Sequence, residues 1–161
     1  TTSYDEMTYE GYAAHGVAIV VDTATDNPTR TIANLRTIFN KNGGTVGTQG
    51  AVEYMFKKKA LFKFNIGNLN LEELELELID FGLEEIGEDT EGHVIIRTPF
   101  NEYGNMNKAL EDKKIEVVSA ELTWVPGNMM ELDEEQSNEV LKLVDHLEQD
   151  DDVQKVYHNL K

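Results

Sequence analysis

Apolar and polar residues follow strand and helix periods along the chain, and the pattern restarts near residue 60 and again near residue 127. The segment from Gly16, G-V-A-I-V-V-D-T, is short, β-branched and almost continuously apolar, which predicts a central strand buried on both faces. Residues 1–15 are polar, are rich in tyrosine and glycine, and follow no period. We therefore expect an N-terminal arm without regular structure.

A helix is predicted over residues 28–41. Asn27 can cap it, and Pro28 suits its first position because proline already has a helical φ and lacks only an N–H that would be unsatisfied there. Its buried stripe consists of four apolar residues at helical spacing: Ile32, Leu35, Ile38 and Phe39. A polar stripe with a cation at either end lies on the opposite side: Arg30, Asn34, Thr37 and Lys41.

Gly43 and Gly44 allow the positive φ that ends a helix. Because they follow the helix, they lie at its negative end, whereas a phosphate-binding loop would have its glycines before a helix and a Gly-Lys-Ser/Thr ending. They therefore indicate a turn and not a nucleotide site. A strand is predicted over Ala51–Lys57, with Lys57–Lys59 at its end and these residues on one face: Val52, Tyr54 and Phe56.

Residues 60–127 predict a second, self-contained unit. A strand at 60–65 precedes the segment L-E-E-L-E-L-E-L-I-D-F, which fits both the strand and the helix period; the cap at Asn70 and the glycine at Gly82 favour a helix. Two strands at 83–87 and 93–98, a helix at 101–113 and a strand at 118–125 complete the order β-α-β-β-α-β, which is that of a ferredoxin-like unit. The buried face of the last strand is predicted to be Val118, Ala120, Leu122 and Trp124.

The last segment completes the first unit. Residues 133–149 predict a helix capped by Asp133, and V-Q-K-V-Y-H predicts a final strand. Since the first unit would otherwise hold only a β-α-β segment, we expect these two elements to complete its sheet. The predicted fold is α+β with two small domains. A ferredoxin-like βαββαβ domain of residues 60–127 is inserted into a discontinuous α/β sandwich of residues 1–59 and 128–161.

The charge is negative and unevenly distributed. The chain has 31 acidic and 14 basic residues, a net charge of −17, but residues 1–59 contain six of each sign. Nucleic-acid binders need cations that replace phosphate counterions, so most of this surface would repel DNA or RNA and only the first third could lie near a phosphate backbone. The acidic segment Glu72–Glu91 is either a surface for a partner protein or a solubilising one.

Other features exclude several classes of protein. The absence of cysteine excludes disulfides, thiolate zinc sites and cysteine nucleophiles, and it fits a cytoplasmic protein. The longest purely apolar run, Val17–Val21, is far shorter than the roughly 20 residues that span a bilayer, so no membrane span is expected. No secretory signal follows Thr1, and because the chain does not begin with methionine we expect a fragment or a processed product.

The candidate functional residues are cations. They could contact the phosphate groups of DNA or RNA, or they could simply form a solvated helix face and a charged strand end. These candidates are Arg30, Arg36, Lys41, Lys57, Lys58 and Lys59. The four histidines are scattered without ligand spacing, and no nucleophile is placed beside a base. We therefore expect no metal, no cofactor and no catalytic site, and thus no enzyme.

Five separated segments resemble one known family. They are Y-E-G-Y (9–12), T-D-N-P-T-R-T (25–31), K-N-G-G (41–44), V-E-Y-M-F (52–56) and D-D-V-Q-K-V-Y-H-N (151–159). In this order they resemble the second and third domains of the YebC/PmpR family. The chain departs from the family pattern at Pro28, where an arginine or similar polar residue is usual, and at Ala13-Ala14, where the family tends to have Gly-Pro.

The resemblance implies a regulator of gene expression. Family members are described as probable transcriptional regulators or as a mitochondrial translational activator, and a more recent view favours a role on the ribosome. They would bind DNA, or RNA on the ribosome, through a basic helical N-terminal domain that precedes the Y-E-G-Y segment and is absent from this sequence. The chain would then be the non-catalytic C-terminal part of such a regulator. The alternative is a ferredoxin-like regulatory module that binds a small ligand or a partner protein.

Overall fold

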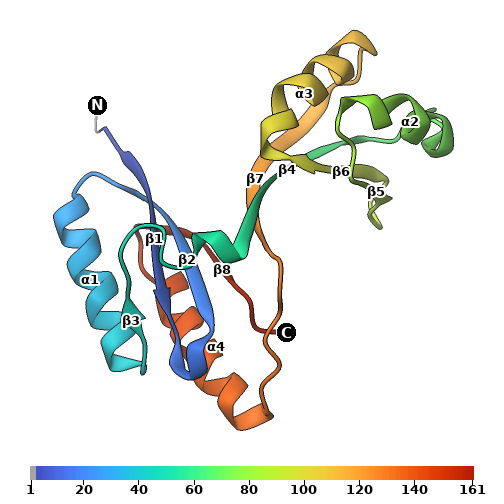
Figure 1. Ribbon diagram of the computed structural model, residues 1–161. Helices are drawn as coiled ribbons and strands as arrows, with labels where there is room; N and C mark the ends of the chain where they lie inside the picture. Colours follow the sequence, from blue (N-terminus) through green and yellow to red (C-terminus); the bar gives the residue numbers. More distant parts are fainter. Residues whose placement is uncertain (1–2) are drawn as a thin grey trace. The chain divides into compact units, whose positions relative to one another are not determined.

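The chain folds into two compact units (Figure 1). The computed structural model describes residues 3–161. The first unit combines the residues up to Lys57 with Pro126–Lys161, and the second consists of Lys58–Val125. The sequence predicts both domain boundaries two residues later along the chain, between residues 59 and 60 and between residues 127 and 128.

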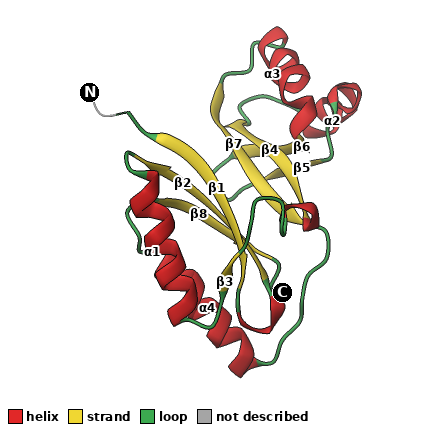
Figure 2. Ribbon diagram, turned by 60° about the vertical axis from the view of Figure 1, so that its left-hand side comes forward, coloured by secondary structure: helices red, strands yellow, loops and turns green. Residues whose placement is uncertain are grey.

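The first unit is a four-stranded antiparallel sheet with two helices on one face (Figure 2). The strand order is β3-β1-β2-β8, from β1 (Asp5–Tyr12), β2 (Ala18–Thr25), β3 (Thr45–Val46) and β8 (Val153–His158). The helices are α1 (Pro28–Lys41) and α4 (Glu134–Glu148). One core cluster joins the two layers, and its largest fully buried members are Val17, Ile19, Leu35, Phe39, Leu143 and Leu147. This is the α/β sandwich that the sequence predicts.

Local sequence signals account for both helices and for the central strand. The Asn27 side chain accepts a hydrogen bond from the Arg30 amide at 3.1 Å, and Pro28 occupies the first helical position. Asp133 caps α4 by accepting from the Gln136 amide at 2.8 Å. The side chains of residues 18–21 in β2 are all fully buried, as the continuous apolar run predicts.

Two predictions for the first unit are wrong. Part of the predicted arm forms β1, which pairs along its length with β2 and at its end with β3. Ala51–Lys57 is not a strand: a turn and the 3-10 helix η2 (Glu53–Met55) occupy most of it, and β4 (Phe56–Asn65) begins only at its end. Glu10 contributes to both errors, because its buried carboxylate makes β1 look polar and takes up amide donors of residues 50–53.

The second unit is a four-stranded sheet in the order β5-β6-β4-β7, with two helices packed in one core cluster against it. Besides β4, its elements are α2 (Leu71–Leu78), β5 (Glu85–Glu88), β6 (His93–Pro99), α3 (Tyr103–Asp112) and β7 (Val117–Pro126). Single 3-10 turns in the chain are η1 (Ala14–Gly16), η3 (Ile79–Phe81) and η4 (Phe100–Glu102). Chain order and strand order together give the predicted ferredoxin-like arrangement.

The segment that fits two periods is a helix, as predicted. Leu74 and Leu78 are buried in the core whereas Leu76 is 72% exposed, which a helical period allows and a strand period does not. The Asn70 side chain accepts from the Glu73 amide at 3.1 Å, and Gly82 has a φ of 92° at the exit of η3. Both local signals therefore act where the sequence places them.

The predicted buried face of the strand at 118–125 is wrong. Val118 is 55% exposed and Leu122 is 41% exposed, whereas Val117 packs against the core. The period-2 rule shows which residues share a face, but it does not show which face the helices cover. In the part of the chain that the structure describes, no helix is long and apolar enough to cross a membrane.

Candidate nucleic-acid interface

Arg30 belongs to an ion-pair network at the start of α1. Its Nη2 atom lies 3.0 Å from Oδ1 of Asp26 and 2.9 Å from Oδ1 of Asp152. The hydrogen bonds with Asp152, and then with Asp26, raise the pKa of the Arg30 guanidinium. A guanidinium that already neutralises two carboxylates has little charge left for a phosphate. Arg30 thus joins α1 to the segment before β8, and its phosphate contact stays a prediction.

Asp152 is the buried centre of this network. It is 8% exposed, and it accepts hydrogen bonds from Thr31 Oγ1 at 2.8 Å and from Arg30 Nη2 at 2.9 Å. Burial alone would raise the pKa of the Asp152 carboxyl, but the hydrogen bonds from Thr31 and Arg30 outweigh burial and lower the pKa below its ordinary value. The carboxylate therefore stays charged when the chain folds.

Asp152→Asn should lower the free energy of unfolding by about 2 kcal/mol at neutral pH, because Arg30 and Thr31 lose a charged acceptor. Since the pKa of Asp152 is lower in the folded state, its contribution is complete above the unfolded value of about 3.9 and is lost as the pH falls through the folded pKa. Urea denaturation at a series of pH values should show the stability difference shrinking only below about pH 4. Exposed Asp151→Asn is the control. A difference that stays constant into acid would contradict this assignment.

Arg36 and Lys41 are the exposed cations of α1 that lie outside the Asp152 network. Neither forms an ion pair with a carboxylate in residues 3–161. Lys41 and Thr37 of the predicted polar stripe face α4, whereas Arg30 lies at the other end of the helix, in the network with Asp152. The stripe is therefore cationic at one end only.

The three lysines at the start of β4 do not form one patch. Lys57 is exposed, but the Lys58 ammonium lies 4.4 Å from the centroid of the Phe100 ring and 5.7 Å from that of Trp124. Lys59 is 9% exposed and pairs with Glu84 at 2.7 Å. Strand alternation points successive side chains to opposite faces, so the run is divided. Of the three, Lys57 is the exposed cation.

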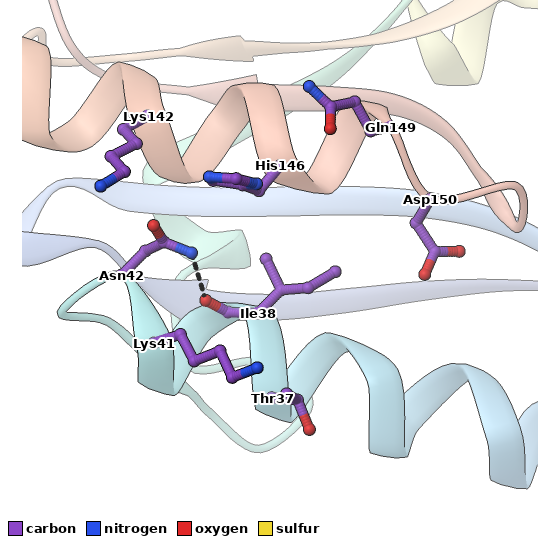
Figure 3. Close-up of a pocket in the computed structure, with 8 residues that line it drawn as sticks. All are labelled: Thr37, Ile38, Lys41, Asn42, Lys142, His146, Gln149 and Asp150. Atoms are coloured by element: carbon purple, nitrogen blue, oxygen red, sulfur yellow. Dashed lines mark hydrogen bonds between the residues drawn. The ribbon is translucent and has the colours of Figure 1, made fainter.

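A cleft of about 540 Å³ lies between the last turns of α1 and the C-terminal half of α4 (Figure 3). Lys142 and His146 extend into it from α4, opposite Lys41 and Asn42 of the α1 end (Figure 3). The remaining lining residues are Thr37, Ile38, Gln149 and Asp150. The sequence did not single out Lys142 or His146, because their nearness to Lys41 depends on the antiparallel packing of two helices that are far apart in the chain.

One group of side chains has ligand spacing for a metal. Asp89, Glu91 and His93 bring ligand atoms within 4.8 Å of one another in the β5–β6 turn. However, Asp89 Oδ1 already accepts the amides of Glu91 and His93, both at 2.9 Å, and Lys63 lies 3.8 Å from its second oxygen. The backbone bond from His93 is the main cause that lowers the pKa of Asp89. These contacts define a stabilised turn.

Residues 4–160 match the family described as "TACO1/YebC second and third domain". The chain belongs to the TACO1/YebC family. It is 50% identical over 163 residues to a "Probable transcriptional regulatory protein" of Myxococcus xanthus, and 47% identical over 161 residues to a protein with the same description in Porphyromonas gingivalis. Each alignment covers 99% of this chain, but 68% and 66% of these relatives respectively.

A solved structure has a similar fold. The crystal structure of the conserved hypothetical protein Aq1575 from Aquifex aeolicus is similar with a TM-score of 0.77 and 35% sequence identity. The similarity covers 100% of this chain and 66% of that one. The chain therefore spans about two thirds of the length of the relatives it matches.

Two of the segments that resemble the TACO1/YebC family meet at Glu10, and a third contacts the nearby residue Tyr12. Glu10 of Y-E-G-Y is 3% exposed, and its carboxylate accepts the amides of Gly50 at 2.6 Å, Val52 at 3.0 Å and Glu53 at 2.6 Å. In the K-N-G-G segment, Gly44 packs against the carbonyl of Tyr12. The other two segments meet at the Arg30–Asp152 network. In this TACO1/YebC chain, the segments that carry the resemblance therefore hold distant parts of the first unit together.

Sequence reasoning missed Glu10 and Asp152. Their roles depend on partners that are 40 and 122 positions away, respectively, so no local pattern reveals them. The segments that resemble the family could have pointed to Glu10 and Asp152, because each of these residues lies inside one of them.

Proposed function

We propose that the chain is the C-terminal part of a non-catalytic regulator of gene expression that binds DNA, or RNA on the ribosome. The observation that carries this proposal is the position of the cations in the first unit that have no carboxylate partner among residues 3–161. Arg36, Lys41 and Lys142 belong to α1 and α4, the two helices that cover one face of the sheet. A helical face with such cations can contact a phosphate backbone. The descriptions of the relatives support the same class of function.

The net charge sets the strength of this binding. With 31 acidic and 14 basic residues, the chain repels nucleic acid over most of its surface. The strongest contacts would come from a basic domain ahead of the Y-E-G-Y segment, as the family resemblance implies. The greater length of the relatives supports this arrangement. The α1–α4 face would then add secondary contacts that orient the protein.

The contacts of the histidines support a non-catalytic role. His15 pairs with Glu139, His93 with Asp89, and His158 Nδ1 accepts the amide of Leu160 at 3.1 Å. Burial lowers the pKa of His158, although Glu148 opposes that shift. None of these three contacts joins the ring to a hydroxyl group that it could activate as a nucleophile. These rings serve as partners in the fold.

Charge reversal on α1 tests the interface. In a mobility-shift or ribosome-pelleting assay at low salt, Arg36→Glu with Lys41→Glu should weaken binding and reduce the slope of log affinity against log salt by about 2, because two phosphate contacts are lost. Both side chains are exposed, so circular dichroism should show an unchanged fold. The matched control is Lys108→Glu with Lys114→Glu, two exposed cations of the second unit. Equal effects of the two pairs would sink the α1 interface.

A further inference from the structure

We propose that the cleft between α1 and α4 is a phosphate-binding site, in which Lys41 and Lys142 hold phosphoryl oxygens and His146 and Gln149 supply further hydrogen bonds. This goes beyond the proposed function, because it names one cleft as the site, adds His146 and Gln149 to it and requires no nucleic acid. It also stands or falls separately, since a free phosphate can occupy the site when no nucleic acid binds.

The cleft has room for a phosphate and the group attached to it. Its volume is about 540 Å³, and an adjoining hollow of about 360 Å³ shares Lys41, Asn42 and Lys142 with it. Sites for small molecules in proteins commonly measure about 300–1,000 Å³. The two lysines therefore lie where two hollows meet, with space on both sides for the rest of a ligand.

Lys41 and Lys142 keep their charge available. Within residues 3–161, neither ammonium has a carboxylate within ion-pair distance, although the chain holds more than twice as many acidic as basic residues. Two carboxylates border the hollows, and both are engaged: Glu139 pairs with His15, and Asp150 Oδ1 accepts the Asp152 amide at 2.9 Å. Two ammonium groups that line the same cleft without such partners favour a ligand of opposite charge.

The end of α1 is capped in a way that suits an anion. The last carbonyls of a helix have partial negative charge and would repel phosphate. Here Asn42 Nδ2 donates to the Ile38 carbonyl at 2.8 Å (Figure 3). The amides of Asn42 and Gly44 donate to the Phe39 carbonyl at 3.1 Å and 2.8 Å. The capped carbonyls present less negative charge to the cleft, and the lysines dominate the field there.

The phosphate could belong to a nucleic-acid backbone or to a free phosphorylated molecule. Two titrations distinguish these sources: inorganic phosphate and a short single-stranded oligouridylate, each followed by NMR of the Asn42 and Gln149 side-chain amides. A chloride titration at matched ionic strength corrects for general salt effects. Saturable shifts with inorganic phosphate support a free phosphate ligand, and shifts with the oligouridylate at lower concentration support a backbone phosphate.

Substitutions on α4 decide the assignment. Lys142→Glu should weaken binding of the effective probe by about tenfold or more, because an attractive charge becomes a repulsive one. Lys142→Gln should have a smaller effect in the same direction, and Lys108→Glu should have none. The proposal is overturned if neither probe gives saturable shifts at Asn42 and Gln149. It is also overturned if Lys142→Glu binds as well as the unmodified chain.

Discussion

Glu10→Ala should lower the free energy of unfolding of the first unit by about 3 kcal/mol, because the amides of Gly50, Val52 and Glu53 lose their common acceptor. Val52 is fully buried, so water cannot replace the carboxylate at its amide without opening the loop. The other two amides are only partly buried, which limits the total loss. Glu10→Gln should recover part of this loss, since one amide oxygen can still accept.

Urea denaturation measures this effect in both units. Far-UV circular dichroism follows the whole chain, whereas the fluorescence of Trp124, the single tryptophan, follows the second unit. The transition of the first unit should move to lower urea. The control is Glu6→Ala, an exposed position of the same strand, with an expected change within about 0.5 kcal/mol. Equal stability of Glu10→Ala and Glu6→Ala would show that the buried carboxylate does not hold the loop.

Gly44→Ala should destabilise the first unit by about 3 kcal/mol, because the added methyl group has no room. A Cβ at Gly44 would lie 2.5 Å from the Tyr12 carbonyl oxygen, 3.1 Å from the Phe39 ring and 3.2 Å from Leu143. The nearest atom belongs to the backbone of β1, which cannot move without breaking its pairing with β2 and β3. The structure therefore assigns the demand for glycine at this position to close packing.

Gly104→Ala is the matched control for this substitution. Gly104 lies in α3, and a Cβ there would meet nothing within 4 Å. Alanine has the higher helix propensity, so this variant should gain about 0.5–1 kcal/mol. Opposite signs for the two variants in the same denaturation assay would support the packing argument. A Gly44→Ala protein as stable as the unmodified chain would contradict it.

Helix positions could be predicted from the sequence because their signals are local. Asn27, Asn70 and Asp133 cap helices through amides three residues ahead, and each cap forms as predicted. The ferredoxin-like order was predictable for a related reason, since each of its elements has its own period. Gly43, with a φ of 78°, provides the predicted exit from α1.

The features that could not be predicted from the sequence depend on contacts between residues that are far apart in the chain. β1 looked irregular because Glu10 stands at a buried position, and the loop amides that donate to its carboxylate lie 40 residues or more away. The same limit applies to the candidate interface. Arg30 and Lys59 read as available cations in the sequence, but the fold gives them carboxylate partners at Asp152 and Glu84. Lys142 shares a cleft with Lys41 only because α4 packs beside α1 in the fold.

One measurement tests the central proposal most directly: the affinity for ribosomes and for RNA. It is compared between this chain and a version that includes the residues its gene encodes before Thr1. Because 31 acidic residues oppose 14 basic ones, the chain alone should bind weakly and lose that binding in moderate salt. The longer version should bind at least about tenfold more tightly under the same conditions, because it adds the basic contacts. Equally tight binding by the 161-residue chain alone would contradict the account.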